Sequence, residues 1–339
     1  MSSLESKPQS LLSRRGRSFL LRLVITFSLL AGFGSVALWR IDIGWNDTWI
    51  AIKAINPWWY LIALVTHYLT FVFRGYRWIL LLKNSSNDGQ NWTPSLWYAS
   101  RVILMSWFAN SVAWFRVGDA YRAYIYSEDS KVSFSTSMGV VLADRIVDLA
   151  VIVVLMITGV IILLAVGQIA PPVLILILGL ALLVILVIAL LAMVFARKWI
   201  SPKLPRQIRE TYHKFYDATM GSFRRMDIVF ILAIAAWLCE VGRLFFVLKA
   251  MGVSISLGLI LFVPMANGLL SGVPLTPGGL GFVETGITGL LGLELAFELA
   301  VAVALVDRTI SFLSTILFGG LAFLIRQINS LRNVVKEDS

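Results

Sequence analysis

The sequence is poor in charged residues, in cysteine and in histidine. Only 14% of its 339 residues are charged, whereas a soluble domain carries about 25%. Hydrophobic residues make up 58% of the chain, and its mean hydropathy is +0.84. This composition excludes an ordinary soluble domain and predicts an integral membrane protein.

The shortage of cysteine and histidine also excludes several kinds of site. Cys239 is the one cysteine, so the chain forms no internal disulfide. His67 and His213 lie on different segments and lack the spacing of metal ligands. We therefore predict no metal site and no cofactor, and the sequence contains no recognised catalytic motif.

Several apolar stretches exceed the roughly 20 residues needed to cross a bilayer. The clearest are Phe19–Trp39, Trp58–Leu82, Met138–Val166, Val173–Ala196, Ile228–Met251 and Ala296–Ile325. They predict an all-α, polytopic helical bundle that forms a single transmembrane domain over residues 18–326.

The net charge of +10 lies mainly near the ends of these stretches, which favours contact with anionic lipid head groups over nucleic acid. Basic loops face the cytoplasm, and this rule assigns to the inside the tail 1–17, the loop 197–227 and the tail 327–339. The connection 41–56 is then outside. Within the basic loop, apolar residues at helical spacing predict a helix on the inner leaflet, but a solvated connector is an equal alternative. We expect a plasma-membrane protein with both termini cytoplasmic.

Two further segments cannot be simple crossings if these assignments hold. Ser95–Phe115 follows a cytoplasmic loop and precedes the polar stretch Arg116–Lys131. The segment from Leu257 to about Leu293 is interrupted by prolines and by the glycine-rich run from Pro277 to Gly281. Such breaks are tolerated at membrane depth only where protein or water satisfies the freed backbone groups. We therefore predict two re-entrant helical hairpins.

The two halves of the chain carry similar polar residues in the same order. Repeat one, about 57–166, contains in order Arg74, Arg77, Asn110, Asp119, Asp144 and Arg145. Repeat two, about 228–326, contains in order Glu240, Arg243, Asn267, Glu284, Asp307 and Arg308. With the predicted orientation the second series crosses the membrane upside down, which is the inverted repeat typical of transporters.

The polar residues inside these apolar stretches are the candidate site. A charge at the bilayer centre costs about 2.5–3.5 kcal/mol, so each must be paired or hydrated. Arginines outnumber carboxylates, and glycine-rich turns expose N–H groups, so both features favour an anionic ligand. We predict that the substrate is bound by Arg74, Arg145, Arg243, Arg308, Asn110, Asn267, Gly278 and Gly279. The carboxylates predicted to orient these arginines or carry a coupling proton are Asp144, Asp307, Glu240, Glu284 and Asp119.

Purely structural roles are alternatives for several of these charges. Glu240 and Arg243 are one helical turn apart and can neutralise each other. Arg77 can extend to the lipid phosphates at the inner end of its helix. Glu284 can cap the half-helix that begins after Gly281.

Four motifs resemble those of the lysylphosphatidylglycerol synthase transmembrane family, which is flippase-like. They are the stretch from Asn110 to Arg122, the stretch from Asp144 to Leu149, the stretch from Pro277 to Glu284, and Asp307-Arg308. The resemblance extends from about Phe19 to Ile325 and implies a lipid-translocating membrane domain. The family form has Pro and Gly ahead of its GD-x-x-R motif, where this chain has Phe115-Arg116-Val117. No acyltransferase-like domain follows, so lysyl transfer is not expected.

The favoured function is therefore a transporter or flippase for an anionic phospholipid or a polyprenyl-phosphate-type lipid. One alternative is a membrane enzyme of phospholipid or lipid-linked glycan modification, for which the only acidic grouping is Asp119, Asp144 and Asp148. The other is an accessory subunit that assembles with a glycosyltransferase or lipid-modifying enzyme. Of these functions, we favour one without enzymatic activity over an enzymatic one.

Overall fold

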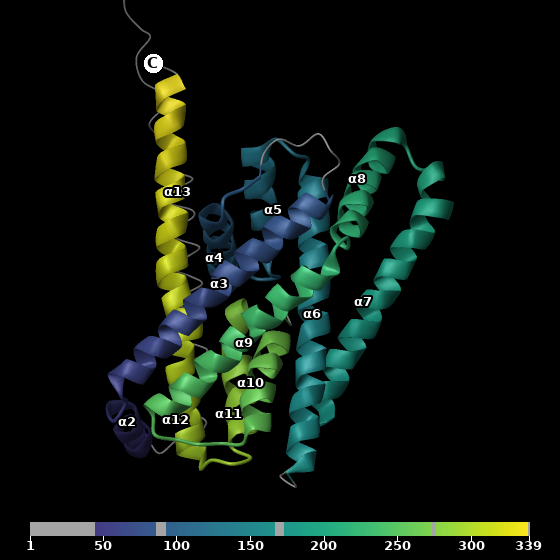
Figure 1. Ribbon diagram of the computed structural model, residues 1–339. Coiled ribbons are helices and arrows are strands. Elements are labelled where there is room, and N and C mark those ends of the chain that lie inside the picture. Colours follow the sequence, from purple (N-terminus) through teal and green to yellow (C-terminus); the bar gives the residue numbers. More distant parts are fainter. Residues whose placement is uncertain (1–44, 86–92, 167–172, 273–275, 338–339) are drawn as a thin grey trace, which may run out of the picture. The chain divides into compact units, whose positions relative to one another are not determined.

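A computed structural model describes residues 45–85, 93–166, 173–272 and 276–337 of the chain. Every regular element in these residues is helical (Figure 1). The predicted first crossing, Phe19–Trp39, and the basic tail 1–17 lie outside the described residues. Four helical runs are long and apolar enough to cross a membrane, and they are Phe134–Ala165, Val173–Trp199, Met226–Ala250 and Phe297–Asn329. The prediction of an all-α, multi-pass membrane protein is confirmed.

Helices α3 (Pro57–Ser85) and α9 (Met226–Ala250) pack along each other in opposite directions (Figure 1). The N–H of Asn56, just before α3, donates to the carbonyl of Ala250 at the end of α9, at 2.8 Å. At the other end, the Asn84 side chain donates to the carbonyl of Ser222, shortly before α9, at 3.2 Å. Small side chains allow the close approach, since the Thr70 hydroxyl reaches the Ala236 carbonyl at 2.9 Å.

The first helix pair is α4 (Leu96–Val112) and α5 (Val117–Ser130). The prediction had the chain turning back within Ser95–Phe115, but the second helix is the polar stretch that follows. The turn forms there because Gly118 lies against α4: its N–H donates to Asn110 Oδ1 at 2.8 Å, and its carbonyl accepts from Ser106 at 2.7 Å. A Cβ at Gly118 would lie 1.9 Å from the Ser106 carbonyl oxygen, so no other residue fits.

The second helix pair is α10 (Leu257–Leu270) and α11 (Phe282–Leu291), with a 3-10 turn at Pro277–Gly279 between them. Gly278 and Gly281 have φ values of 61° and 81°, which side chains disfavour. The proline at 274 lies outside the described residues. The predicted break in the segment is therefore present, and it separates two short helices.

Three long helical runs complete the bundle. They are α6 (Phe134–Ala165), α7 (Val173–Trp199) and the run formed by α12 (Phe297–Arg308), a π turn (Thr309–Ser314) and α13 (Thr315–Glu337). The last run was predicted as one regular helix, but it contains the π turn directly after Arg308. Helix α6 and the α12–α13 run point in opposite directions (Figure 1). Each packs against a short helix of the other half, α6 against α10 and α13 against α4.

Two smaller helices lie in segments predicted as connections, and one of them was expected as a helix. The expected connection 41–56 contains α2 (Trp45–Lys53), which packs on α12 through Thr48, a residue with 1% exposure. The basic loop forms α8 (Arg206–Ser222), as its apolar spacing predicted. Its buried face of Ala218, Thr219 and Ser222 packs against α6 and α3, and Ile208 is 55% exposed. The loop is therefore a docked helix rather than a plain connector.

Candidate functional site

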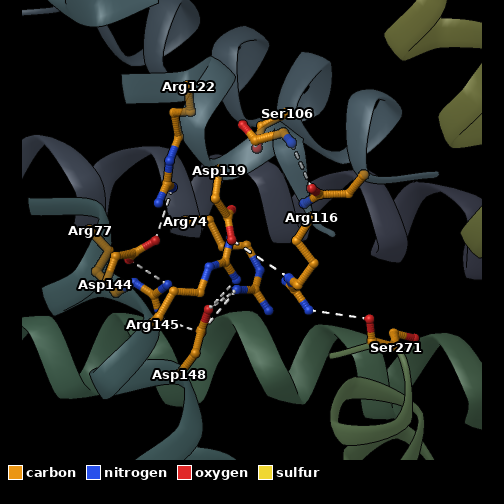
Figure 2. A network of polar contacts seen from close by, with 12 residues as sticks. Arg74, Arg77, Ser106, Arg116, Asp119, Arg122, Asp144, Arg145, Asp148 and Ser271 are labelled. Carbon is orange, nitrogen blue, oxygen red and sulfur yellow. Dashed lines mark hydrogen bonds and ion pairs between the residues drawn. The ribbon is translucent and has the colours of Figure 1, made fainter. Parts of the chain in front are cut away.

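Asp148 on α6 is the centre of a buried charge cluster (Figure 2). Its carboxylate accepts hydrogen bonds from Arg74 at 2.9 Å, from Arg77 at 2.8 Å and from Arg145 at 3.2 Å. The indole N–H of Trp237 on α9 donates to the same group at 3.1 Å. A single carboxylate thus holds three guanidinium groups together, and it compensates for much of the cost of removing them from water.

Asp144 lies one helical turn before Asp148 and extends the cluster. Arg77 pairs with it at 2.7 Å and Arg122 of α5 pairs with it at 2.9 Å. The side chains of these three residues are almost fully buried. Arg77 therefore does not extend to the lipid phosphates, and Asp144 acts within the protein by joining α3, α5 and α6.

The outer part of the cluster is formed by Arg145 and the first turn of α5. Arg145 donates to Asp119 at 2.7 Å, and Arg116 lies 3.6 Å from the same carboxylate. Asp119 is the third residue of α5, where a negative charge is favoured by the helix dipole. Arg116 also donates to the carbonyl of Ser271 after α10, at 3.3 Å, so it connects the turns of the two helix pairs (Figure 2).

The second half of the chain contains a matching set of ion pairs. Arg243 of α9 pairs with Glu240 at 3.1 Å and with Asp307 of α12, and its side chain is fully buried. Arg308 donates to Glu284 at 2.5 Å and to the Gly278 carbonyl at 3.1 Å. The other oxygen of Glu284 accepts the N–H of Gly281 at 2.6 Å, so this residue both caps α11 and pairs with an arginine.

Two ion pairs of one set have a counterpart in the other. In each half, an arginine on a long helix pairs with the Asp of an Asp-Arg sequence: Arg77 with Asp144, and Arg243 with Asp307. In each half, the arginine of that Asp-Arg sequence pairs with the third residue of the second short helix. These pairs are Arg145 with Asp119 and Arg308 with Glu284. The similar order of residues in the sequence thus becomes a similar order of contacts.

A cavity of about 500 Å³ lies between these clusters and the two helix pairs. Among the predicted site residues, those that line it are Arg74, Arg145, Arg308, Glu240, Asn110, Asn267 and Gly278. The predicted residues that are not in its lining are Arg243, Gly279, Asp144, Asp307, Glu284 and Asp119. The second group contacts the first or the helices that position it, and Gly279 has a φ of 71° in the turn beside the cavity.

Several lining residues were not predicted. The cavity is also lined by Arg116, Asp148, Trp107, Trp237, Ser111 and Ser271. Asp148 shares a helix face with Asp144, but it was considered only as part of the acidic grouping of the enzyme alternative and not as a site residue. The two tryptophans follow no sequence signal, because α4 and α9 meet at Arg74 only in the folded protein. Arg74 lies between their rings, 5.2 Å from Trp107 and 4.8 Å from Trp237.

The lining combines cationic and apolar side chains. Among the described residues it contains four arginines and two carboxylates, which are Arg74, Arg116, Arg145, Arg308, Asp148 and Glu240. The apolar part includes Leu149 and Ile152 of α6 and Leu178 and Leu182 of α7. The π turn after Arg308 contributes Ser311 and Phe312. No group of three or more His, Cys, Asp or Glu side chains in the described part of the chain is placed to hold a metal ion.

These features define a polytopic α-helical membrane protein that encloses an arginine-rich cavity between two pairs of short helices. The chain belongs to the lysylphosphatidylglycerol synthase TM region family, whose model matches residues 19–319. It is similar to the UPF0104 membrane protein MJ1078 of Methanocaldococcus jannaschii, with 26% identity over 68% of this chain and 97% of the relative. It is also similar to the UPF0104 membrane protein PH1989 of Pyrococcus horikoshii, with 26% identity over 78% of this chain and 86% of the relative. A UPF0104 membrane protein of Methanothermobacter thermautotrophicus has 25% identity over 74% of this chain and 78% of its own length.

Proposed function

We propose that this protein moves an anionic amphiphile, either an anionic phospholipid or a polyprenyl-phosphate-type lipid, across the plasma membrane. The observation that carries the proposal is the cavity lining, in which four arginines and two carboxylates adjoin an apolar wall. A phosphate group matches the planar donor fork of arginine, and acyl or prenyl chains match leucine and isoleucine.

The head group is held by the arginines that are not fully buried. The side chains of Arg116 and Arg145 are 32% and 25% exposed, whereas those of Arg74 and Arg77 are almost completely buried. A phosphate that enters the cavity replaces Asp148 as the partner of Arg145, whose bond to this carboxylate is the longest of the three. Asp148 thereby keeps the arginines in place while the cavity contains no ligand.

Two inverted repeats with re-entrant hairpins account for the way the lipid crosses. Helices α3 and α9 are antiparallel, and the ion pairs of one half recur in the other. In this arrangement each of α4–α5 and α10–α11 enters the membrane from one side and returns to it. Rocking of one half against the other then opens the cavity to each leaflet in turn. The basic helix α8 and both chain termini face the cytoplasm.

Reconstitution into liposomes tests this function. The protein is incorporated with a fluorescently labelled phosphatidylglycerol, and the labelled lipid that becomes accessible to an added quencher is measured over time. We expect movement of this lipid, no chemical change of it, and less movement of labelled phosphatidylcholine, whose head group has no net charge. Chemical conversion of the lipid would support the enzyme alternative, and an inert protein would support the accessory-subunit alternative.

Variants of the cavity connect any movement to the site. Arg308→Met and Arg145→Met remove cations from the lining, so each is expected to reduce the initial rate at least 10-fold. Arg206→Met on α8 removes an exposed arginine that pairs with Glu210 and is the matched control. Equal rates for all three variants would contradict the assignment of the cavity as the lipid pathway.

A further inference from the structure

His67 is a buried titratable residue that the charge clusters described above do not include. It lies on α3, its side chain is 0% exposed, and it is enclosed by α9 and α13. Its Nε2 is 3.3 Å from the hydroxyl of Thr315, and its Nδ1 is 3.4 Å from one carboxylate oxygen of Glu240. That oxygen and Nδ1 have no other hydrogen-bond partner among the described residues.

The hydroxyl of Thr315 lies within hydrogen-bonding distance of both His67 Nε2 and the Ser311 carbonyl. A threonine has one hydroxyl proton, and Thr315 donates it to the carbonyl of Ser311 at 2.9 Å. Its oxygen therefore accepts from Nε2–H of His67. If the ring were neutral, Nδ1 would present a lone pair to the Glu240 carboxylate. Two acceptors would then face each other in a buried site, which is unfavourable unless a proton lies between them.

We propose that His67 and Glu240 form a proton-binding site in the wall of the cavity. Glu240 lines the cavity, whereas His67 lies behind it, so the proton exchanges through the carboxylate. The other oxygen of Glu240 accepts from Arg243 at 3.1 Å, which stabilises the ionised carboxylate. The bound proton consequently lies on His67, which forms an imidazolium with N–H groups toward Glu240 and Thr315.

The charges around the pair come from four neighbouring elements. Arg243 on α9 also pairs with Asp307 on α12, and Arg74 on α3 is held by Asp148 on α6. From α4 the uncharged ring of Trp107 lies 6.2 Å from His67. From the π turn Ser314 bonds Tyr68, a neighbour of His67 on α3, at 2.9 Å. Each acidic group in this set already has an arginine partner, so His67 is the group that gains or loses the proton.

The proton site is connected to the part of the chain that carries Arg308. His67 bonds Thr315, Thr315 bonds Ser311, and Ser311 lines the cavity within the π turn that follows Arg308. Loss of the proton leaves Nδ1 facing a carboxylate, and rotation of the ring away from this carboxylate also withdraws Nε2 from Thr315. This rotation loosens the contact of α3 with the π turn. This part of the inference rests on the proposed function, and it makes the proton the coupling ion of lipid movement.

The chain contains only two histidines, which makes the first test direct. His213 lies on α8, bonded to Ser201, so His213→Gln leaves one histidine signal with little effect on the cavity. In protein labelled with nitrogen-15 histidine in lipid nanodiscs at neutral pH, we expect hydrogen on both ring nitrogens of His67. Glu240→Gln supplies its own amide donor to Nδ1, so His67 becomes the neutral Nε2–H tautomer. A parent protein in which either ring nitrogen of His67 carries no hydrogen would overturn the proton site.

The second test concerns coupling. A pH gradient across the liposomes is expected to change the rate of labelled phosphatidylglycerol movement at least 5-fold. His67→Gln, which keeps hydrogen-bonding groups but binds no proton, is expected to abolish this dependence, while His213→Gln retains it. Equal gradient dependence in the two variants would overturn the coupling role. If the parent protein moves no lipid while the histidine spectra are as expected, the proposed function fails and the proton site stands.

Discussion

Replacement of Arg77 by methionine tests whether the buried ion pairs hold the helices of the first half, α3, α5 and α6, together. Its side chain is 0% exposed and pairs with Asp144 at 2.7 Å and with Asp148 at 2.8 Å. Arg77→Met leaves Asp144 with Arg122 alone, while Asp148 keeps two of its three arginines. Removal of one partner of a buried pair costs about 3–5 kcal/mol. Because both carboxylates retain a cation, we expect a loss near the lower end, about 3 kcal/mol.

The free energy of unfolding can be measured in mixed micelles by titration with a denaturing detergent, with the fluorescence of the 12 tryptophans as the signal. Arg206→Met is the matched control, because Arg206 and its partner Glu210 are exposed on α8. An exposed helical pair of this kind contributes about 0.3–0.5 kcal/mol. If Arg77→Met destabilised the protein no more than Arg206→Met, the buried clusters would not stabilise the bundle as described.

Three further predictions concern the turn, the orientation and one ion pair at the end of a helix pair. Gly278→Ala should lower both stability and lipid movement more than Gly281→Ala. Both glycines have positive φ, but a Cβ at Gly278 would lie 2.4 Å from a ring carbon of Phe312, whereas a Cβ at Gly281 would have open space. Equal shifts of the melting temperature in the two variants would contradict this prediction. In a cysteine-free background, Ile208→Cys should react with an impermeant thiol reagent only from the cytoplasmic side and Asp47→Cys only from outside, and the reverse pattern would overturn the orientation. Burial acts to raise the pKa of Asp129, but hydrogen bonds lower it by more, and the first of these comes from the guanidinium of Arg326 on α13. The pKa of Asp129 therefore lies below its ordinary value. The stabilisation is therefore present at neutral pH and is lost as the pH falls through this lowered pKa, so Asp129→Asn should destabilise the protein at pH 7 and destabilise it less at about pH 3, as measured by thermal unfolding.

Hydropathy and charge predicted most of the helices, because long apolar stretches have few other structures available in a membrane. The predicted helix boundaries were wrong where polar residues form a helix. The stretch that becomes α5 is too polar for a membrane helix by composition, and the partner of its Arg122, Asp144 on α6, is brought to it only by the fold. The π turn after Arg308 likewise has no local signal.

The candidate site was predicted in part, and the reason is geometric. The sequence identifies costly charges, but it does not distinguish an arginine that faces a cavity from one that faces a carboxylate. Arg243 and Arg308 were both predicted to bind the substrate, yet Arg243 is enclosed by Asp307 and by Glu240, the partner considered as its alternative, while Arg308 lines the cavity. Only the crossing of α9 with α12 makes this difference.

The most direct test of the central claim is an electron cryo-microscopy map of the protein in nanodiscs that contain phosphatidylglycerol. The account predicts density for a lipid phosphate within hydrogen-bonding distance of Arg145 and Arg308, with its chains along Leu178 and Leu182 of α7. A cavity filled by protein side chains, or arginines that face acyl chains with no phosphate between them, would contradict it.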